Sequence, residues 1–240
     1  LHALRVLEKA KGFTIDSLIA AAYDNYLTGF EPLVPQLVKA WDDLPAGDPL
    51  KAQLAAQVAV LRAWDLRYSV ESVPTSLAVY WAQDMVKRAG PAARASDTPV
   101  LDYVTANGTP RERLEALARA SDKLAADFGT WQTPWGEINR FQRISGDVDQ
   151  QYDDSKPSYP VAFPSAVWGS LASFGMVAPQ KTKRIYGDRG NSFVAVVEFG
   201  PRLRAWAVRE GGNSGDPNSP HFTDQVERFA SGNLRQVYFY

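Results

Sequence analysis

Apolar residues recur every three or four positions through the first half of the chain, which is the spacing of amphipathic helices. Thr14, Asp48 and Thr109 each precede such a run, and their side-chain oxygens can accept hydrogen bonds from the free N–H groups of a first helical turn. A later run is predicted to end before Gly90-Pro91, because proline disrupts a helix interior. The pattern predicts a helical region over residues 1–130.

The second half consists of shorter apolar runs separated by glycine and proline, which is typical of β-strands. Gly200-Pro201 predicts a hairpin turn, and residues 223–231 predict a short helix that Gly232 ends. Residues 131–240 are therefore predicted to form a mixed β region, and helices followed by strands indicate an α+β fold. The predicted strands cover residues 138–143, 170–177, 192–199, 203–208 and 236–239.

The predicted strand from Phe193 to Phe199 is apolar on both faces except for Glu198, which indicates a central strand covered on each side. A carboxylate in such surroundings needs a partner, since an unpaired buried charge costs several kcal/mol. Glu198 is therefore expected to be buried. It either orients a catalytic base or pairs across the hairpin with Arg202 or Arg204, and both interpretations stay open.

A loop of small, turn-forming residues runs from Gly211 to Gln225. Loops of this composition often carry function. Asn213 and Ser214 can hydrogen-bond a ligand or satisfy the backbone of the loop itself, and His221 can act as a general base or brace the start of a helix. Asn213, Ser214, His221 and Gln225 are predicted to form a scaffold near a functional site.

The composition and charge of the chain exclude several kinds of chemistry. The 240 residues carry 26 basic and 27 acidic side chains and no basic tract, so nucleic acid is not an expected partner. Without cysteine, and with two histidines far apart in the sequence, neither disulfides nor a histidine-rich metal site is expected. Neither a phosphate-binding glycine motif nor a G-x-S-x-G elbow is present. No apolar run reaches the roughly 20 residues of a membrane span.

Several motifs occur in an order that is specific to one enzyme family. They are residues 135–141 (WGEINRF), 168–175 (WGSLASFG), 183–187 (KRIYG), 190–200 (GNSFVAVVEFG) and 211–225 (GGNSGDPNSPHFTDQ). Each motif alone is weak, but the set resembles the C-terminal part of the β chain in the penicillin acylase family of N-terminal nucleophile (Ntn) hydrolases. The motifs are most similar to those of acyl-homoserine lactone and aculeacin A acylases.

The resemblance implies a fold and a chemistry. The C-terminal strands would belong to an αββα sandwich of which this chain is a fragment, and a zymogen would cut itself into an α and a β chain. The nucleophile would be a serine at the new N-terminus, which attacks a linear amide with its own amine as the base. Since the chain begins with Leu1, the nucleophile, the oxyanion donors and the calcium ligands of the family would lie upstream. The chain itself would hold no cofactor and no metal, and alone it would be inactive.

The resemblance also implies partners and a substrate. Glu198 matches a late-strand glutamate that supports a histidine near the nucleophile in related acylases. The partners would be the remaining β-chain segment and the α chain of the same precursor, in the periplasm or outside the cell. The predicted reaction is hydrolysis of an N-acyl-homoserine lactone or a related small acyl amide, with a role in quorum quenching or antibiotic biosynthesis. The alternative is a non-catalytic binding or interface module on an acylase scaffold.

Overall fold

The computed structural model describes residues 2–175 and 181–238, and its combination of helices and strands confirms the α+β class. The chain forms two compact units. We call residues 27–67 and 71–135 the helical unit, and residues 1–26, 68–70 and 136–240 the strand unit. In the described ranges every strand follows residue 138, as the pattern predicts. The units nevertheless differ from the predicted division at residue 130, because the first 26 residues belong with the strands.

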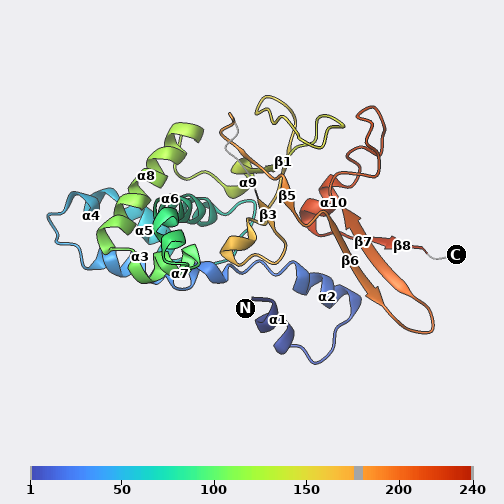
Figure 1. Ribbon diagram of the computed structural model, residues 1–240, viewed down its shortest axis with the longest axis horizontal. Helices are drawn as coiled ribbons and strands as arrows, with labels where there is room; N and C mark the ends of the chain where they lie inside the picture. The colour runs from blue at the N-terminus through green and yellow to red at the C-terminus, as the bar shows by residue number, and fades with distance from the viewer. Residues whose placement is uncertain (1, 176–180, 239–240) are drawn as a thin grey trace. The chain divides into compact units, whose positions relative to one another are not determined.

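The helical unit follows the start signals of the sequence (Figure 1). The Thr109 hydroxyl accepts from the N–H of Glu112 at 3.2 Å, and the Glu112 carboxylate accepts from the N–H of Thr109 at 2.8 Å. Asp48 accepts from the N–H of Leu50 at 2.9 Å. The elements of this unit are η1 (Thr28–Phe30), α3 (Leu33–Asp42), α4 (Pro49–Gln53), α5 (Ala55–Arg62), α6 (Val73–Ala95), α7 (Val100–Asn107) and α8 (Pro110–Phe128).

Helix α6 continues through Gly90 and Pro91 to Ala95, so the predicted end before these residues is wrong. A proline in a helix interior costs about 3 kcal/mol. Helix α6 packs along α8, and Leu77 and Trp81 on its buried face are fully enclosed. Burying large side chains of this kind stabilises by roughly 1.5–3 kcal/mol each, which offsets the cost of the proline.

The strand unit combines two N-terminal helices with short strands from the second half of the chain (Figure 1). Thr14 caps α2, since its hydroxyl accepts from the N–H of Ser17 at 3.1 Å. The elements are α1 (His2–Glu8), α2 (Ile15–Ala22), α9 (Trp135–Ile138), β1 (Asn139–Phe141), β2 (Tyr159–Pro160), η2 (Ala166–Trp168), β3 (Phe174–Gly175), β4 (Ile185–Tyr186), β5 (Arg189–Gly190), β6 (Phe193–Glu198), β7 (Arg204–Arg209), α10 (Val226–Ser231) and β8 (Arg235–Val237).

The described strands form three small sheets, with strand orders β2-β1-β4, β3-β5 and β6-β7-β8. Strands β6 and β7 are antiparallel and confirm the predicted hairpin, and Gly232 ends α10 with a φ of 70°. The strand predicted over residues 170–177 is reduced to β3, and residues 176 and 177 lie outside the described residues. The strand predicted over 236–239 appears as β8, and residue 239 also lies outside them.

Four phenylalanines from distant segments form the centre of the strand unit. Phe163 lies edge-on to Phe174 and to Phe229, with ring centroids 5.9 and 5.4 Å apart, and Phe141 contacts the same two rings. All four are at least 96% buried, and T-shaped pairs of this kind add to the burial of apolar area. This cluster joins β1, β3 and α10.

Strand β6 is not the covered central strand that its sequence predicts. It lies at the edge of the described sheet, and β7 lies in the middle. Helix α2 packs on β6, and Val196 is 6% exposed, whereas Phe193 and Val197 on the opposite face are 60% and 41% exposed. A strand that is apolar on both faces is usually packed against another element on each face. The described residues supply a packed element on only one face of β6.

Candidate functional site

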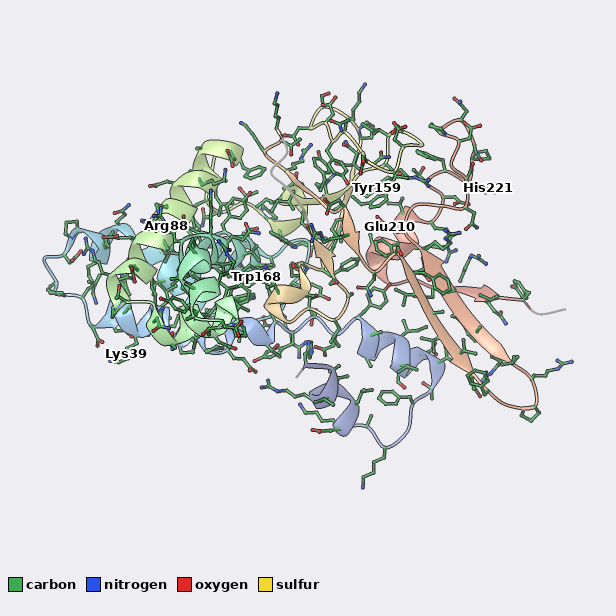
Figure 2. The ribbon with its side chains drawn as sticks, viewed as in Figure 1. Lys39, Arg88, Tyr159, Trp168, Glu210 and His221 are labelled. Atoms are coloured by element: carbon green, nitrogen blue, oxygen red, sulfur yellow. The ribbon has the colours of Figure 1, made fainter. Side chains whose placement is uncertain are left out.

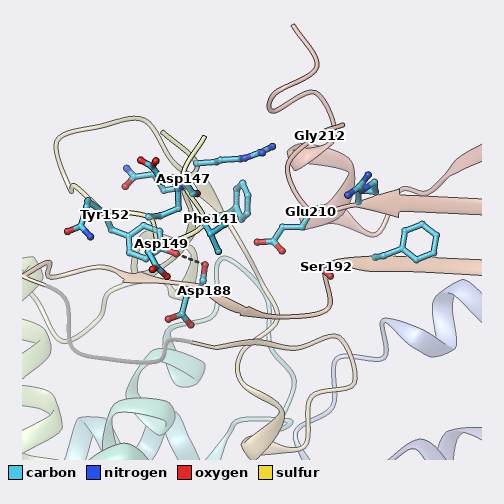
Figure 3. Close-up of a pocket in the computed structure, with 16 residues that line it drawn as sticks. Phe141, Asp147, Asp149, Tyr152, Asp188, Ser192, Glu210 and Gly212 are labelled. Atoms are coloured by element: carbon cyan, nitrogen blue, oxygen red, sulfur yellow. Dashed lines mark hydrogen bonds between the residues drawn. The ribbon is translucent and has the colours of Figure 1, made fainter. Parts of the chain in front are cut away.

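A polar cavity of about 960 Å³ lies in the strand unit, beside the start of the glycine-rich loop (Figure 3). Its wall combines residues 141–152, the segments 187–188 and 192–193, and residues 209–212 at the end of β7. Asp149, Asp188 and Glu210 line this cavity from three different segments (Figure 3). The tertiary structure therefore collects acidic groups that are far apart in the sequence.

Glu210 is the residue of this cavity with the most perturbed chemistry. Burial raises the pKa of its carboxyl, and the nearby Arg143 guanidinium offsets only part of this effect. Its backbone N–H donates to the Ser192 carbonyl at 2.9 Å, which holds the residue at the end of the β6–β7 ladder. A carboxyl of this kind can bind and release a proton closer to neutral pH than an exposed one.

The rest of the cavity wall is held by contacts that leave little freedom. Arg143 donates to the Phe222 carbonyl at 2.7 Å and lies over the Phe222 ring at 4.1 Å. The Tyr152 hydroxyl donates to the Gly187 carbonyl at 3.1 Å. Burial raises the pKa of Tyr152 to about 12, with smaller contributions from Asp188 and Glu210. The site thus presents carboxylates and a guanidinium on a fixed frame, which suits a polar ligand.

The glycine-rich loop is braced mainly by its own residues. The N–H of Gln225 donates to the Gly211 carbonyl at 2.8 Å, and the Gln225 side chain accepts from the N–H of Arg209 at 3.2 Å. Asn213 accepts from the Arg209 guanidinium at 3.2 Å, and the N–H of Ser214 donates to the His221 carbonyl at 3.1 Å. The Ser214 hydroxyl accepts from the N–H of Asp216 at 3.1 Å, which agrees with the backbone-satisfying interpretation, whereas the Asn213 side chain bonds another side chain. The role of the loop as a scaffold near an active site stays a prediction.

His221 lies on the outside of this loop, and its side chain is 69% exposed (Figure 2). Its Nδ1 lies 2.9 Å from an Asp224 carboxylate oxygen, three residues along the chain. Gly212 packs so closely beneath this turn that an added Cβ would collide with the His221 carbonyl. The pair braces the start of the segment that leads into α10. No serine or threonine hydroxyl contacts either histidine ring in the described part of the chain.

Glu198 lies at the exposed end of β6 and forms an ion pair with Arg204, its directly opposite residue on β7. The side chains are 46% and 56% exposed, so the expected burial of Glu198 is wrong. The cause is its position, since the strand ends at Glu198 and the hairpin turn leaves both side chains in solvent. Arg204 is one of the two partners for Glu198 that the sequence allows. An orienting role for Glu198 stays a prediction.

The structure makes two titratable residues conspicuous that the sequence pattern did not single out. Glu210 directly precedes Gly211-Gly212, and this position beside the loop was the available signal. His2 on α1 is 6% exposed, with Nδ1 2.7 Å from the Gly169 carbonyl oxygen and Nε2 2.9 Å from an Asp24 carboxylate oxygen. Because both ring nitrogens are engaged, His2 ties α1 to the strand unit and offers no free nitrogen for catalysis.

Across residues 2–175 and 181–238, no group of three or more histidine, aspartate or glutamate side chains is arranged to hold a metal ion. These residues do not fit the calcium site that the resemblance implies, and the upstream location of its ligands stays a prediction. In the same ranges, each helix is too short or too polar to cross a bilayer.

Comparison with known proteins shows the lineage of the chain. The family model described as penicillin amidase matches residues 1–240, the full length of the sequence. The chain belongs to the penicillin amidase family. A solved structure of a thermostable penicillin G acylase from Alcaligenes faecalis is also similar, at 16% sequence identity and a TM-score of 0.48. The match covers 99% of this chain and 48% of that chain, so the penicillin amidase chain described here spans about half the length of that relative.

Proposed function

We propose that the chain is the C-terminal part of an amide-cleaving acylase whose N-terminal serine nucleophile lies outside residues 1–240. The observation that carries this proposal is the family match over the whole sequence. The substrate is an N-acyl-homoserine lactone or a related linear acyl amide, since the motifs of residues 135–141 and 211–225 are most similar to those of such acylases. The biological role is quorum quenching or antibiotic biosynthesis, in the periplasm or outside the cell.

The contacts of the described residues support a nucleophile supplied from elsewhere. An Ntn serine needs no histidine as its base, because its own α-amine accepts the proton. Within residues 2–175 and 181–238, the imidazole rings of His2 and His221 contact carbonyl and carboxylate groups and no hydroxyl. The remaining β-chain segment and the α chain of the precursor would bring the serine, the oxyanion donors and the calcium ligands. Glu198 would then support a histidine from that part, exchanging its contact with Arg204 for one with the imidazole.

The test compares the complete gene product with the 240-residue chain. The complete, self-processed protein is expected to release free fatty acid from N-acyl-homoserine lactones, and the chain alone is expected to release none above a mock purification. A complete protein whose new N-terminal serine is replaced by alanine is the matched control. Turnover by the 240-residue chain alone would contradict the external nucleophile, and an inactive but processed complete protein would favour a binding module.

A further inference from the structure

A cavity of about 480 Å³ lies in the helical unit between α6, α7 and α8. Helices α7 and α8 both pack along α6 (Figure 1). Small or flexible apolar side chains line much of the cavity, among them Met85 and Ala89 from α6, Val104 from α7 and Ala116 from α8. Alanine leaves space between packed helices that a larger side chain would fill, and methionine adapts its shape to its neighbours. The volume lies within the range of about 300–1,000 Å³ that is typical of small-molecule pockets.

Two guanidinium groups line this cavity side by side, because one carboxylate binds both of them. Arg88 of α6 (Figure 2) donates from Nε to Asp84 Oδ2 at 3.0 Å. Arg119 of α8 donates to the same oxygen from Nε at 3.1 Å and from Nη2 at 2.7 Å. Arg88 and Arg119 both line the cavity, whereas Asp84 does not. The carboxylate therefore lies behind the two guanidinium groups and offsets the repulsion between them.

This arrangement leaves positive charge and hydrogen-bond donors for a ligand. Two guanidinium groups share one carboxylate, so one positive charge is not balanced by Asp84. A guanidinium has five N–H donors. Within residues 2–175 and 181–238, Arg88 uses one of them and Arg119 uses two, all on Asp84. The remaining N–H groups of both arginines are available to an acceptor in the cavity.

The acidic residues that line the same cavity already have donors of their own. The Glu112 carboxylate accepts from the N–H of Thr109 at 2.8 Å, as part of the cap of α8. The Glu115 carboxylate accepts from Arg111 at 2.9 Å. A carboxylate in the first turn of a helix is further stabilised by the positive end of the helix dipole. The charge left to attract a ligand is therefore positive.

We propose that this cavity binds a monocarboxylic acid with an apolar chain. The ligand carboxylate accepts hydrogen bonds from Arg88 and Arg119, because the planar guanidinium matches the two oxygens of a carboxylate. The apolar chain lies against Met85, Ala89 and Ala116, where it loses contact with water. In the acylase this ligand is the acid that is released from the substrate. That last assignment rests on the proposed function, whereas the binding site itself rests on the cavity and its two arginines.

Methyl NMR on the complete, processed acylase tests the site at the cavity itself. The protein is labelled at its methionine methyl groups, and the Met85 signal is identified by its loss in Met85→Leu. Octanoate is expected to shift the Met85 signal and to saturate it, whereas octylamine, with the same chain and a positive head group, is not. A Met85 signal that stays in place at millimolar octanoate would overturn the proposal. An equal shift with octylamine would overturn it as well, because the guanidinium groups would then not select the ligand.

Two variants of the complete protein separate the charge of the site from its shape. Arg119→Gln removes one guanidinium and is expected to weaken octanoate binding about tenfold or more. Ala89→Leu keeps both arginines but fills part of the cavity, and it should also weaken binding. The matched control is Arg111→Met, on the same helix but outside the cavity lining, which should bind octanoate like the parent protein.

Binding of octanoate with the parent affinity by both Arg119→Gln and Ala89→Leu would show that the ligand does not occupy this cavity. Far-UV circular dichroism checks that each variant is folded, and either variant alone decides the question. The NMR readout does not depend on turnover. An inactive acylase whose Met85 signal responds to octanoate would therefore contradict the proposed function and leave the binding site intact.

Discussion

Arg113 in α8 is expected to be the most stabilising charged residue of the helical unit. It is 4% exposed, and its guanidinium donates to the carbonyls of Val104 and Thr105 in the last turn of α7 and to the side chain of Gln36 in α3. Carbonyls in a last helical turn have no partner within their own helix. One side chain therefore connects three helices.

The cost of Arg113→Met follows from these contacts. The Val104 carbonyl keeps a second donor, the N–H of Gly108 at 3.0 Å, whereas the Thr105 carbonyl and the Gln36 oxygen lose the guanidinium. An unsatisfied buried polar group costs about 1–3 kcal/mol, and hydrogen bonds to charged groups contribute about 1.5–3 kcal/mol. Thr105 and Gln36 are half-buried, so we expect Arg113→Met to lower the free energy of unfolding by about 3 kcal/mol. For a chain of this size that corresponds to a melting temperature roughly 6–12 °C lower.

The matched control is Arg111→Met, two residues earlier on the same helix. Arg111 is 53% exposed and pairs with Asp48 and Glu115 at 2.7 and 2.9 Å. Because water and salt screen exposed ion pairs, the loss of these two pairs should lower the melting temperature much less than Arg113→Met does. Thermal unfolding followed by far-UV circular dichroism compares both variants with the parent chain. Equal shifts for Arg113→Met and Arg111→Met would refute the reasoning, because burial would then not distinguish the two residues.

Two further predictions concern the acidic residues of the strand unit. In the complete acylase, Glu198→Gln should lower turnover about tenfold or more. The melting temperature should change by no more than about 4 °C, because the ion pair of Glu198 with Arg204 is exposed. Unchanged turnover would show that Glu198 has no orienting role. Glu210→Gln should raise the melting temperature at neutral pH, because burial raises the pKa of Glu210 and stability is lost as the pH rises through that pKa. The rise in melting temperature should vanish in acid, where Glu210 is protonated in the folded and in the unfolded protein. An equal rise at all pH values would contradict an origin in the raised pKa of Glu210.

The sequence by itself determined the features that depend on neighbours within a few residues. The caps at Thr14, Asp48 and Thr109 lie where the sequence predicts them, because a capping oxygen bonds an N–H two or three residues ahead. The β6–β7 hairpin and the end of α10 at Gly232 depend on turn geometry of similarly short range. Family membership was also predictable, since the order of several motifs along the chain carries it.

Burial and pairing were decided by the tertiary structure. Helix α6 runs through Pro91 because its contacts with α8 outweigh one local penalty. Glu198 is exposed and Glu210 is half-buried, although both are single carboxylates close to apolar strand residues. The difference depends on which distant segments approach each side chain, residues 141–152 in the case of Glu210. Local sequence specifies the helix or strand that holds a residue. The solvent exposure of its side chain depends on all the segments that pack around it, and only the folded chain brings these together.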